Sequence, residues 1–144
     1  MELSRVMDKM WILRSLISIL LLVSTPAFAN IGEIAQHKGI STVERDKDKL
    51  NGEVGLGLFM NDKIATGKGR LRMDFIDDTR VDVTEHSRMV IDEFIYDPNT
   101  KTGALGMKAT LGAVRYASGQ IAKNSRQRVN IRTPSATINV RGTD

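Results

Sequence analysis

The chain has 144 residues, a net charge of +4 and no cysteine, and 41% of its residues are hydrophobic. This length fits one domain with a modest core. Without cysteine the chain has no disulfide framework and no thiolate nucleophile, so disulfide-stapled scaffolds and cysteine enzymes are excluded. We expect the fold to rest on its apolar core alone.

Residues 1–29 have the pattern of a cleavable signal peptide. Lys9 and Arg14 precede a compact apolar run over residues 15–23, and the stretch from Ala27 to Ala29 has the small-x-small form of a signal-peptidase site. Cleavage there makes Asn30 the first residue of the mature protein. The apolar run is about half of the ~20 residues that span a bilayer, which leaves an uncleaved membrane anchor as the alternative. We expect a periplasmic or secreted protein of a bacterial envelope, with no transmembrane segment after cleavage.

Basic residues are concentrated in the second half of the chain. From Thr100 onward there are eight basic residues and one acidic residue, whereas residues 30–99 have an acidic excess. Because an exported protein rarely meets nucleic acid, we expect an envelope protein or an anionic envelope polymer as the partner. A solvated sheet face that binds nothing is the alternative. The candidate partner surface is the densest basic group, Arg126, Arg128 and Arg132.

The stretch 60–83 predicts antiparallel strands joined by turns. Leu71, Met73 and Phe75 alternate with polar residues, which is the period-2 pattern of a half-buried strand. The polar stretch 77–79 then breaks the run, and the alternation resumes with Val81 facing inward. This stretch therefore predicts a meander of short strands.

The rest of the mature chain also predicts mostly short strands separated by turns and loops. The other expected elements are, in order, a strand or a single helical turn at 31–39, an exposed loop at 40–50, strands at 53–59 and 88–96, a turn at 97–100, one bent strand or two at 104–116, an exposed bend at 121–126, and strands at 129–133 and 136–141. Many short strands with frequent turns predict an all-β, antiparallel sandwich or roll after the signal peptide. We expect an N-terminal strand and exposed loop over 30–51 and a β domain over 52–144.

The mature chain ends in a specific motif, in which Thr133-Pro134-x-Ala136 leads into Val140 and Arg141-Gly142-Thr143. Together with turn motifs from about Gly52 onward, this ending resembles the FecR domain. Asn61-Asp62 and Asp77-Asp78 stand where the family favours Gly-Asp and Asp-Gly turns, and Asn and Asp tolerate the positive φ that such turns require. The residues that carry the resemblance, read here as structural, are Asp62, Thr66, Gly67, Gly112, Gly119, Thr133, Pro134, Arg141, Gly142 and Thr143.

The resemblance implies a signalling domain of the envelope. The regulators that give the family its name have a cytoplasmic anti-sigma segment and one membrane helix ahead of a periplasmic domain, which receives a signal from an outer-membrane transporter. Here a signal peptide replaces both parts, so the anti-sigma role is not expected. The family pattern continues past the position of Thr143 into another strand, so we expect a truncated domain with an open sheet edge that can pair with a partner or with itself.

The mature chain offers no catalytic constellation. His37 and His86 lie far apart without metal-ligand spacing, so neither a metal site nor a cofactor is expected. Alternation places Asp74 and Asp82 on the outer face of the predicted strands. We therefore expect a non-enzymatic binding or signal-relay module, with an anionic-polymer-binding module as one alternative. The other alternative, an envelope hydrolase, would need a pair of carboxylates at a concave rim.

Overall fold

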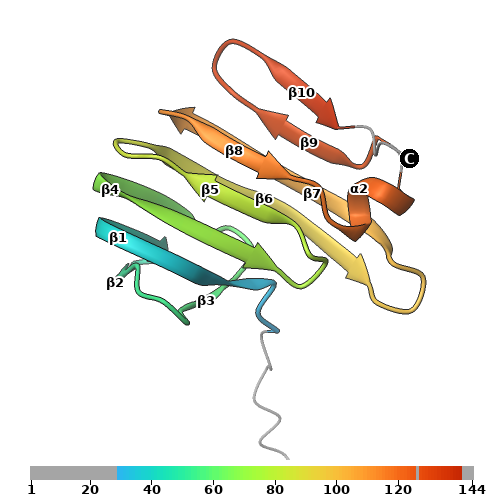
Figure 1. Ribbon diagram of the computed structural model, residues 1–144, viewed down its shortest axis with the longest axis horizontal. Coiled ribbons are helices and arrows are strands. Elements are labelled where there is room, and N and C mark those ends of the chain that lie inside the picture. Colours follow the sequence, from blue (N-terminus) through green and yellow to red (C-terminus); the bar gives the residue numbers. More distant parts are fainter. Residues whose placement is uncertain (1–28, 126, 141–144) are drawn as a thin grey trace, which may run out of the picture.

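The structure, a computed structural model, describes residues 29–125 and 127–140, in which the chain forms ten strands and one short helix. The strands are β1 (Gly32–Arg45), β2 (Asp48–Asn51), β3 (Gly57–Leu58), β4 (Lys63–Phe75), β5 (Arg80–Val83), β6 (Arg88–Asp97), β7 (Thr102–Leu111), β8 (Val114–Ala117), β9 (Val129–Arg132) and β10 (Thr137–Val140); the helix is α2 (Gln120–Asn124). The all-β prediction is confirmed (Figure 1).

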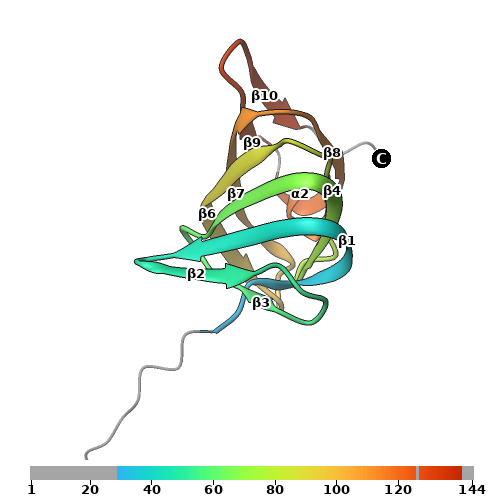
Figure 2. The ribbon, with the colours of Figure 1, turned by 90° about the vertical axis from the view of Figure 1, so that its left-hand side faces the viewer.

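The sheet divides at β4 into two arms. The start of β4 pairs with β6, which continues through β7 and β9 to β10, whereas Leu71–Asp74 of β4 pair with β5, which leads to β8. On its other side β4 pairs with β1 along most of its length. The pairing is antiparallel throughout the described sheet except between β7 and β9, which are parallel. Figure 2 shows the two arms curving around α2, which makes the sheet a roll.

The core lies between these arms, on the apolar faces that the alternation predicts. Leu71, Met73 and Phe75 of β4 are buried, as are Val81 and Val83 of β5. The ring of Phe75 stacks on that of Phe94 from β6, with centroids 5.5 Å apart. Burying each such side chain contributes about 1.5–3 kcal/mol to folding, so this packing joins the arms.

The expected exposed loop at 40–50 is wrong. Of the stretch 31–39, residues 32–39 are strand, and β1 continues from them to Arg45 before turning into β2; Val43 is completely buried. Irregularities in the β1–β4 register next to Ala35 and Ile40 shift the side-chain alternation. The many charged residues of this stretch suggested a loop. The strand forms nevertheless, because β4 and β2 pair with it on either side. The stretch before position 52 therefore belongs to the same sheet as the rest.

Two further expectations are corrected. The strand expected at 53–59 is mainly a turn that leaves Val54 exposed, and only β3 remains of it. The exposed bend expected at 121–126 is instead α2 over its described part, with Ile121 and Ala122 buried against the core. The stretch 104–116 forms two strands, which break at Gly112, where φ is +79°.

Some expectations fall outside the described residues. These include the signal peptide up to residue 28, Arg126, and the ending from Arg141 to Thr143. Ala29 and Asn30 are described and are exposed ahead of β1. Within the described ranges, no helix is both long enough and apolar enough to cross a membrane.

Candidate functional site

The family-like residue Asp62 is a buried anchor. Its carboxylate accepts two hydrogen bonds from Arg45, from Nε at 2.9 Å and from Nη2 at 2.7 Å, and a third from the backbone N–H of Phe59. The guanidinium also lies 4.1 Å from the centroid of the Phe59 ring. The hydrogen bond with Asp62 raises the pKa of Arg45. Asp62 thereby fixes the end of β1 against the turn before β4.

Thr66 joins the β5–β6 turn to β4. Its hydroxyl donates to the carbonyl of Thr84 at 2.5 Å and accepts from the N–H of Ser87 at 3.0 Å. Gly112 packs on the same turn, because a Cβ at that position would lie 2.0 Å from Ser87 Oγ. The carbonyl of Gly67 accepts a hydrogen bond from the N–H of His86. These residues hold turns together and present no chemistry to solvent.

Asp77 connects the β4–β5 turn to α2. Its carboxylate accepts hydrogen bonds from the N–H and hydroxyl of Thr79 and from the N–H of Ile121, and its carbonyl accepts from the N–H of Gln120 at 2.6 Å. A Cβ on Gly119 would lie 2.3 Å from the nitrogen of Thr79. The close contact requires glycine and locks the helix onto the turn.

The remaining described signature positions are also structural. Thr133 and Pro134 form the β9–β10 turn, in which Thr133 N–H donates to the Ala136 carbonyl and Ala136 N–H donates to Thr133 Oγ1. Asn61 has φ +70° and Asp78 has φ +66°. Both positive φ values fall where the sequence predicted them, so the turns are kept without glycine.

The basic group at 126–132 is only partly available for binding. Arg132 forms an ion pair with Asp92 of β6. Arg128 is exposed just before β9, and Arg126 lies outside the described residues. Its role as a partner surface remains a prediction.

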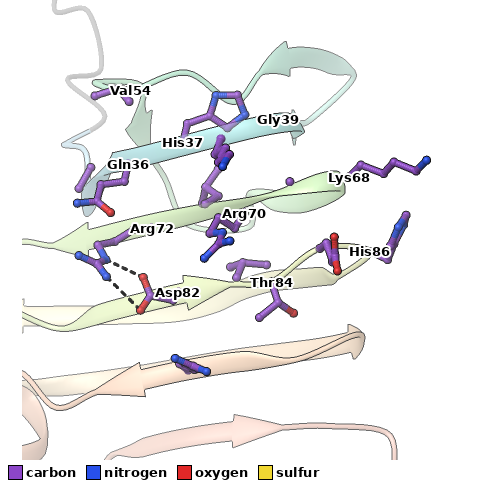
Figure 3. Close-up of a pocket in the computed structure, with 17 residues that line it drawn as sticks. Gln36, His37, Gly39, Val54, Lys68, Arg70, Arg72, Asp82, Thr84 and His86 are labelled. Atoms are coloured by element: carbon purple, nitrogen blue, oxygen red, sulfur yellow. Dashed lines mark hydrogen bonds and ion pairs between the residues drawn. The ribbon is translucent and has the colours of Figure 1, made fainter.

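A broad hollow of about 1290 Å³ lies over β1, β4, β5 and β8. We call it the basic hollow, because its lining contains five basic residues and two acidic ones. Figure 3 shows Lys68, Arg70 and Arg72 along β4, with Asp82 facing Arg72 from the neighbouring strand. The basic residues are Lys38, Lys68, Arg70, Arg72 and Arg115; the acidic ones are Asp82 and Glu85.

The strand register decides how these charges pair. Arg72 lies opposite Asp82 and binds it, with Nε 2.6 Å from Oδ1, and this hydrogen bond raises the pKa of Arg72. Arg115 lies opposite the same carboxylate on its other side. Lys38 lies directly opposite Arg70, a pair of like charges. Among the described residues no ion pair neutralises Lys38, Lys68, Arg70 or Arg115.

The sequence did not predict the basic hollow. Its cations come from three strands, and only the register brings Lys38 and Arg115 to the same face as Arg70. The one local signal was the basic residue at every second position of β4, at Lys68, Arg70 and Arg72. Three basic residues on the outer face of one strand indicate an exposed basic surface.

His37 and His86, the two histidines considered for a metal site, both line the basic hollow. His86 occupies the β5–β6 turn with φ +54°, and the Nε2 atom of His37 is buried without a hydrogen-bond partner in the described part of the chain. The described residues contain no group of three metal-ligating side chains. Asp74 and Asp82, the carboxylates considered for a hydrolase, are held by Arg80 and Arg72 respectively.

Comparison with protein families gives a match to this chain. The family model described as FecR protein matches residues 62–144, which is more than half of the chain. No curated protein and no solved structure matches the chain. The matched family acts in signal transduction in the bacterial envelope and is regulatory, without known enzymatic members. Its match covers the anchors at Asp62, Asp77 and Gly119, and the chain belongs to the FecR family.

Proposed function

We propose that this protein is an exported, non-catalytic module that binds a partner protein in the bacterial envelope and relays a signal through it. The observation that carries the proposal is the basic hollow, an exposed face on which four cations have no carboxylate partner in the described structure. Family membership supports a regulatory role. The pattern of residues 1–29 supports export, with Ala27 and Ala29 marking the cleavage site before Asn30.

The fold suits this role, because its anchored sheet can present side chains to a partner in fixed positions. β4 runs through both arms, and the signature residues fasten the turns at its two ends through Asp62 and Asp77. Loops and faces outside these anchors are free to vary without loosening the core. A binding role therefore fits exposed side chains on a fixed sheet better than it fits the signature residues themselves.

In-cell photo-crosslinking tests this function. The full chain is produced in its own bacterium with a photoreactive residue at Gln36, which is exposed within the basic hollow, or at Ile95, which is exposed on β6. Asn99, in the β6–β7 turn, is a third position. We expect a light-dependent adduct with one envelope protein from at least one position. A folded, exported chain that forms no adduct from any of them would refute the proposal.

A further inference from the structure

We propose that the basic hollow binds an extended, acidic segment of the partner protein, lying along β4. This inference rests on the proposed function and adds the docking place and the chemistry of the partner. It moves the expected binding surface from Arg126, Arg128 and Arg132 to the face of β1, β4 and β8 that carries Lys38, Arg70 and Arg115.

The like-charge pair of Lys38 and Arg70 is the first argument. Residues directly opposite on antiparallel strands have close Cβ atoms, and like charges there destabilise the sheet. A carboxylate placed between the two side chains would replace this repulsion with two attractions. The same holds beside Arg115, which competes with Arg72 for the single carboxylate of Asp82. The face therefore lacks negative charge at specific positions.

The spacing of the cations is the second argument. Arg70 and Arg72 occupy alternate positions in a regularly paired part of β4, so their Cα atoms are about 6.6–6.8 Å apart. Lys68 precedes them beside the register irregularity between Thr66 and Gly69. An extended peptide presents alternate side chains with the same repeat. A segment with an acidic residue at every second position can thus meet the cations of β4 one for one, with Lys38 and Arg115 on its flanks.

The floor and lining of the hollow favour a peptide over a sugar polymer. The lining has no phenylalanine, tyrosine or tryptophan on which a sugar ring could stack. Gly39 lies opposite Gly69, and both glycines line the hollow without a side chain. This part of the floor is therefore bare backbone, which another chain can approach closely. Val54, which is 65% exposed, adds an apolar contact at the rim.

Fluorescence anisotropy tests the inference with protein purified after export. The probe is a labelled peptide of alternating glutamate and serine, compared with a peptide of the same composition whose glutamates form one block. We expect the alternating peptide to bind more tightly. We expect Arg70→Gln and Arg115→Gln each to weaken its binding about two- to five-fold. Lys108→Gln, an exposed cation on β7 outside the hollow, should leave binding unchanged.

Each contrary result has a distinct meaning. Equal losses for Lys108→Gln and Arg70→Gln would show unspecific attraction and overturn the proposal. Tighter binding of polygalacturonate, with no binding of the alternating peptide, would replace the protein partner with an anionic polymer and also overturn it. A crosslinked partner from Ile95 or Asn99 but not from Gln36, together with no peptide binding, would refute this inference while leaving the proposed function intact.

Discussion

The FecR-like residues use their polar atoms to hold backbone and neighbouring side chains. Asp62 and Asp77 are completely buried, and each carboxylate accepts at least three hydrogen bonds. A buried carboxylate without donors would be strongly unfavourable, so these contacts explain why acidic residues stand at turns. The family motif at these positions therefore stabilises the fold.

Replacing Asp62 should destabilise the protein severely. Asp62→Ala removes both carboxylate oxygens that accept from Arg45 and leaves its guanidinium, whose side chain is only 28% exposed, with the Gly57 carbonyl but without a counter-charge. Breaking a buried ion pair from one side costs about 3–5 kcal/mol, and the partial exposure of Arg45 favours the lower end. Urea denaturation followed by circular dichroism measures the loss.

The matched control is Glu44→Gln. Glu44 pairs with Lys63 at 3.0 Å, but both side chains are more than half exposed. Exposed pairs contribute little, so the change should stay within about 0.5 kcal/mol. Similar losses for the two variants would mean that the Asp62 contacts are no stronger than a surface pair.

Tyr116 should make the stability sensitive to alkaline pH. Burial raises the pKa of its hydroxyl, so the unfolded chain ionises first as the pH rises. The stability that this group contributes is fully present below about pH 10, the unfolded value, and is lost as the pH rises through the folded pKa. Tyr116→Phe should weaken this alkaline loss, measured as the change in urea midpoint between about pH 8 and pH 11.

Tyr96 provides the comparison for that experiment. Desolvation also raises the pKa of its hydroxyl, so part of the alkaline loss should persist in Tyr116→Phe and disappear only in the double variant. Tyr116→Phe keeps the aromatic ring and removes only a hydroxyl beside Thr79, Ser118 and Gly119, so at neutral pH stability should change by no more than the ~0.5–1.5 kcal/mol of one hydrogen bond. If the double variant lost as much stability at alkaline pH as the unchanged protein, other groups would cause the loss.

At the scale of elements, the alternation of apolar and polar residues predicted the strands in which this pattern is uninterrupted. The inward faces of β4 and β5 and the two strands β9 and β10 followed from it. The positive φ of Asn61 and Asp78 followed from the resemblance of their turns to those of the family. The β1–β2 hairpin was missed because its apolar content is low and its partners are distant. α2 was missed because one turn of helix has no periodicity to detect, and contacts with Asp77 stabilise it.

Gly119 should be essential for the docking of α2. A Cβ in Gly119→Ala would meet the nitrogen of Thr79 at 2.3 Å and the carbonyl oxygen of Asp77 at 2.4 Å, and backbone atoms cannot move aside cheaply. We expect a loss of about 1–3 kcal/mol in unfolding free energy, as for other overpacked sites. Thermal and urea denaturation measure it.

Gly67→Ala is the control, because Gly67 also belongs to the family-like residues but has room for a Cβ. A Cβ at Gly67 would lie 3.6 Å from its nearest neighbour, Ile40 Cβ, which is an ordinary contact. Its stability should change by less than about 0.5 kcal/mol. If both glycines proved equally sensitive, the close approach at Gly119 would not be the cause.

At the scale of the whole molecule, the fold brings distant charges to one face. No stretch of sequence reveals that Lys38 lies opposite Arg70, because the register depends on irregularities in the pairing of β1 with β4. Sequence patterns predicted the class of fold, whereas the basic hollow follows from tertiary pairing alone. A cationic face that opposes its own folding is the kind of compromise expected at binding surfaces.

Lys38→Glu should reveal this compromise directly. A glutamate opposite Arg70 replaces repulsion with attraction, so we expect a gain of about 0.5–1 kcal/mol in stability from the cross-strand pair. The same carboxylate occupies the place that we assign to the acidic segment, so binding of the alternating peptide should fall further than in Lys38→Gln. Lys38→Gln removes only the repulsion and should be intermediate in both respects. Calorimetric unfolding and anisotropy on the same samples give the two quantities. A Lys38→Glu variant that lost stability would show that Lys38 and Arg70 do not repel each other in the folded protein, and unchanged peptide binding would place the acidic segment elsewhere.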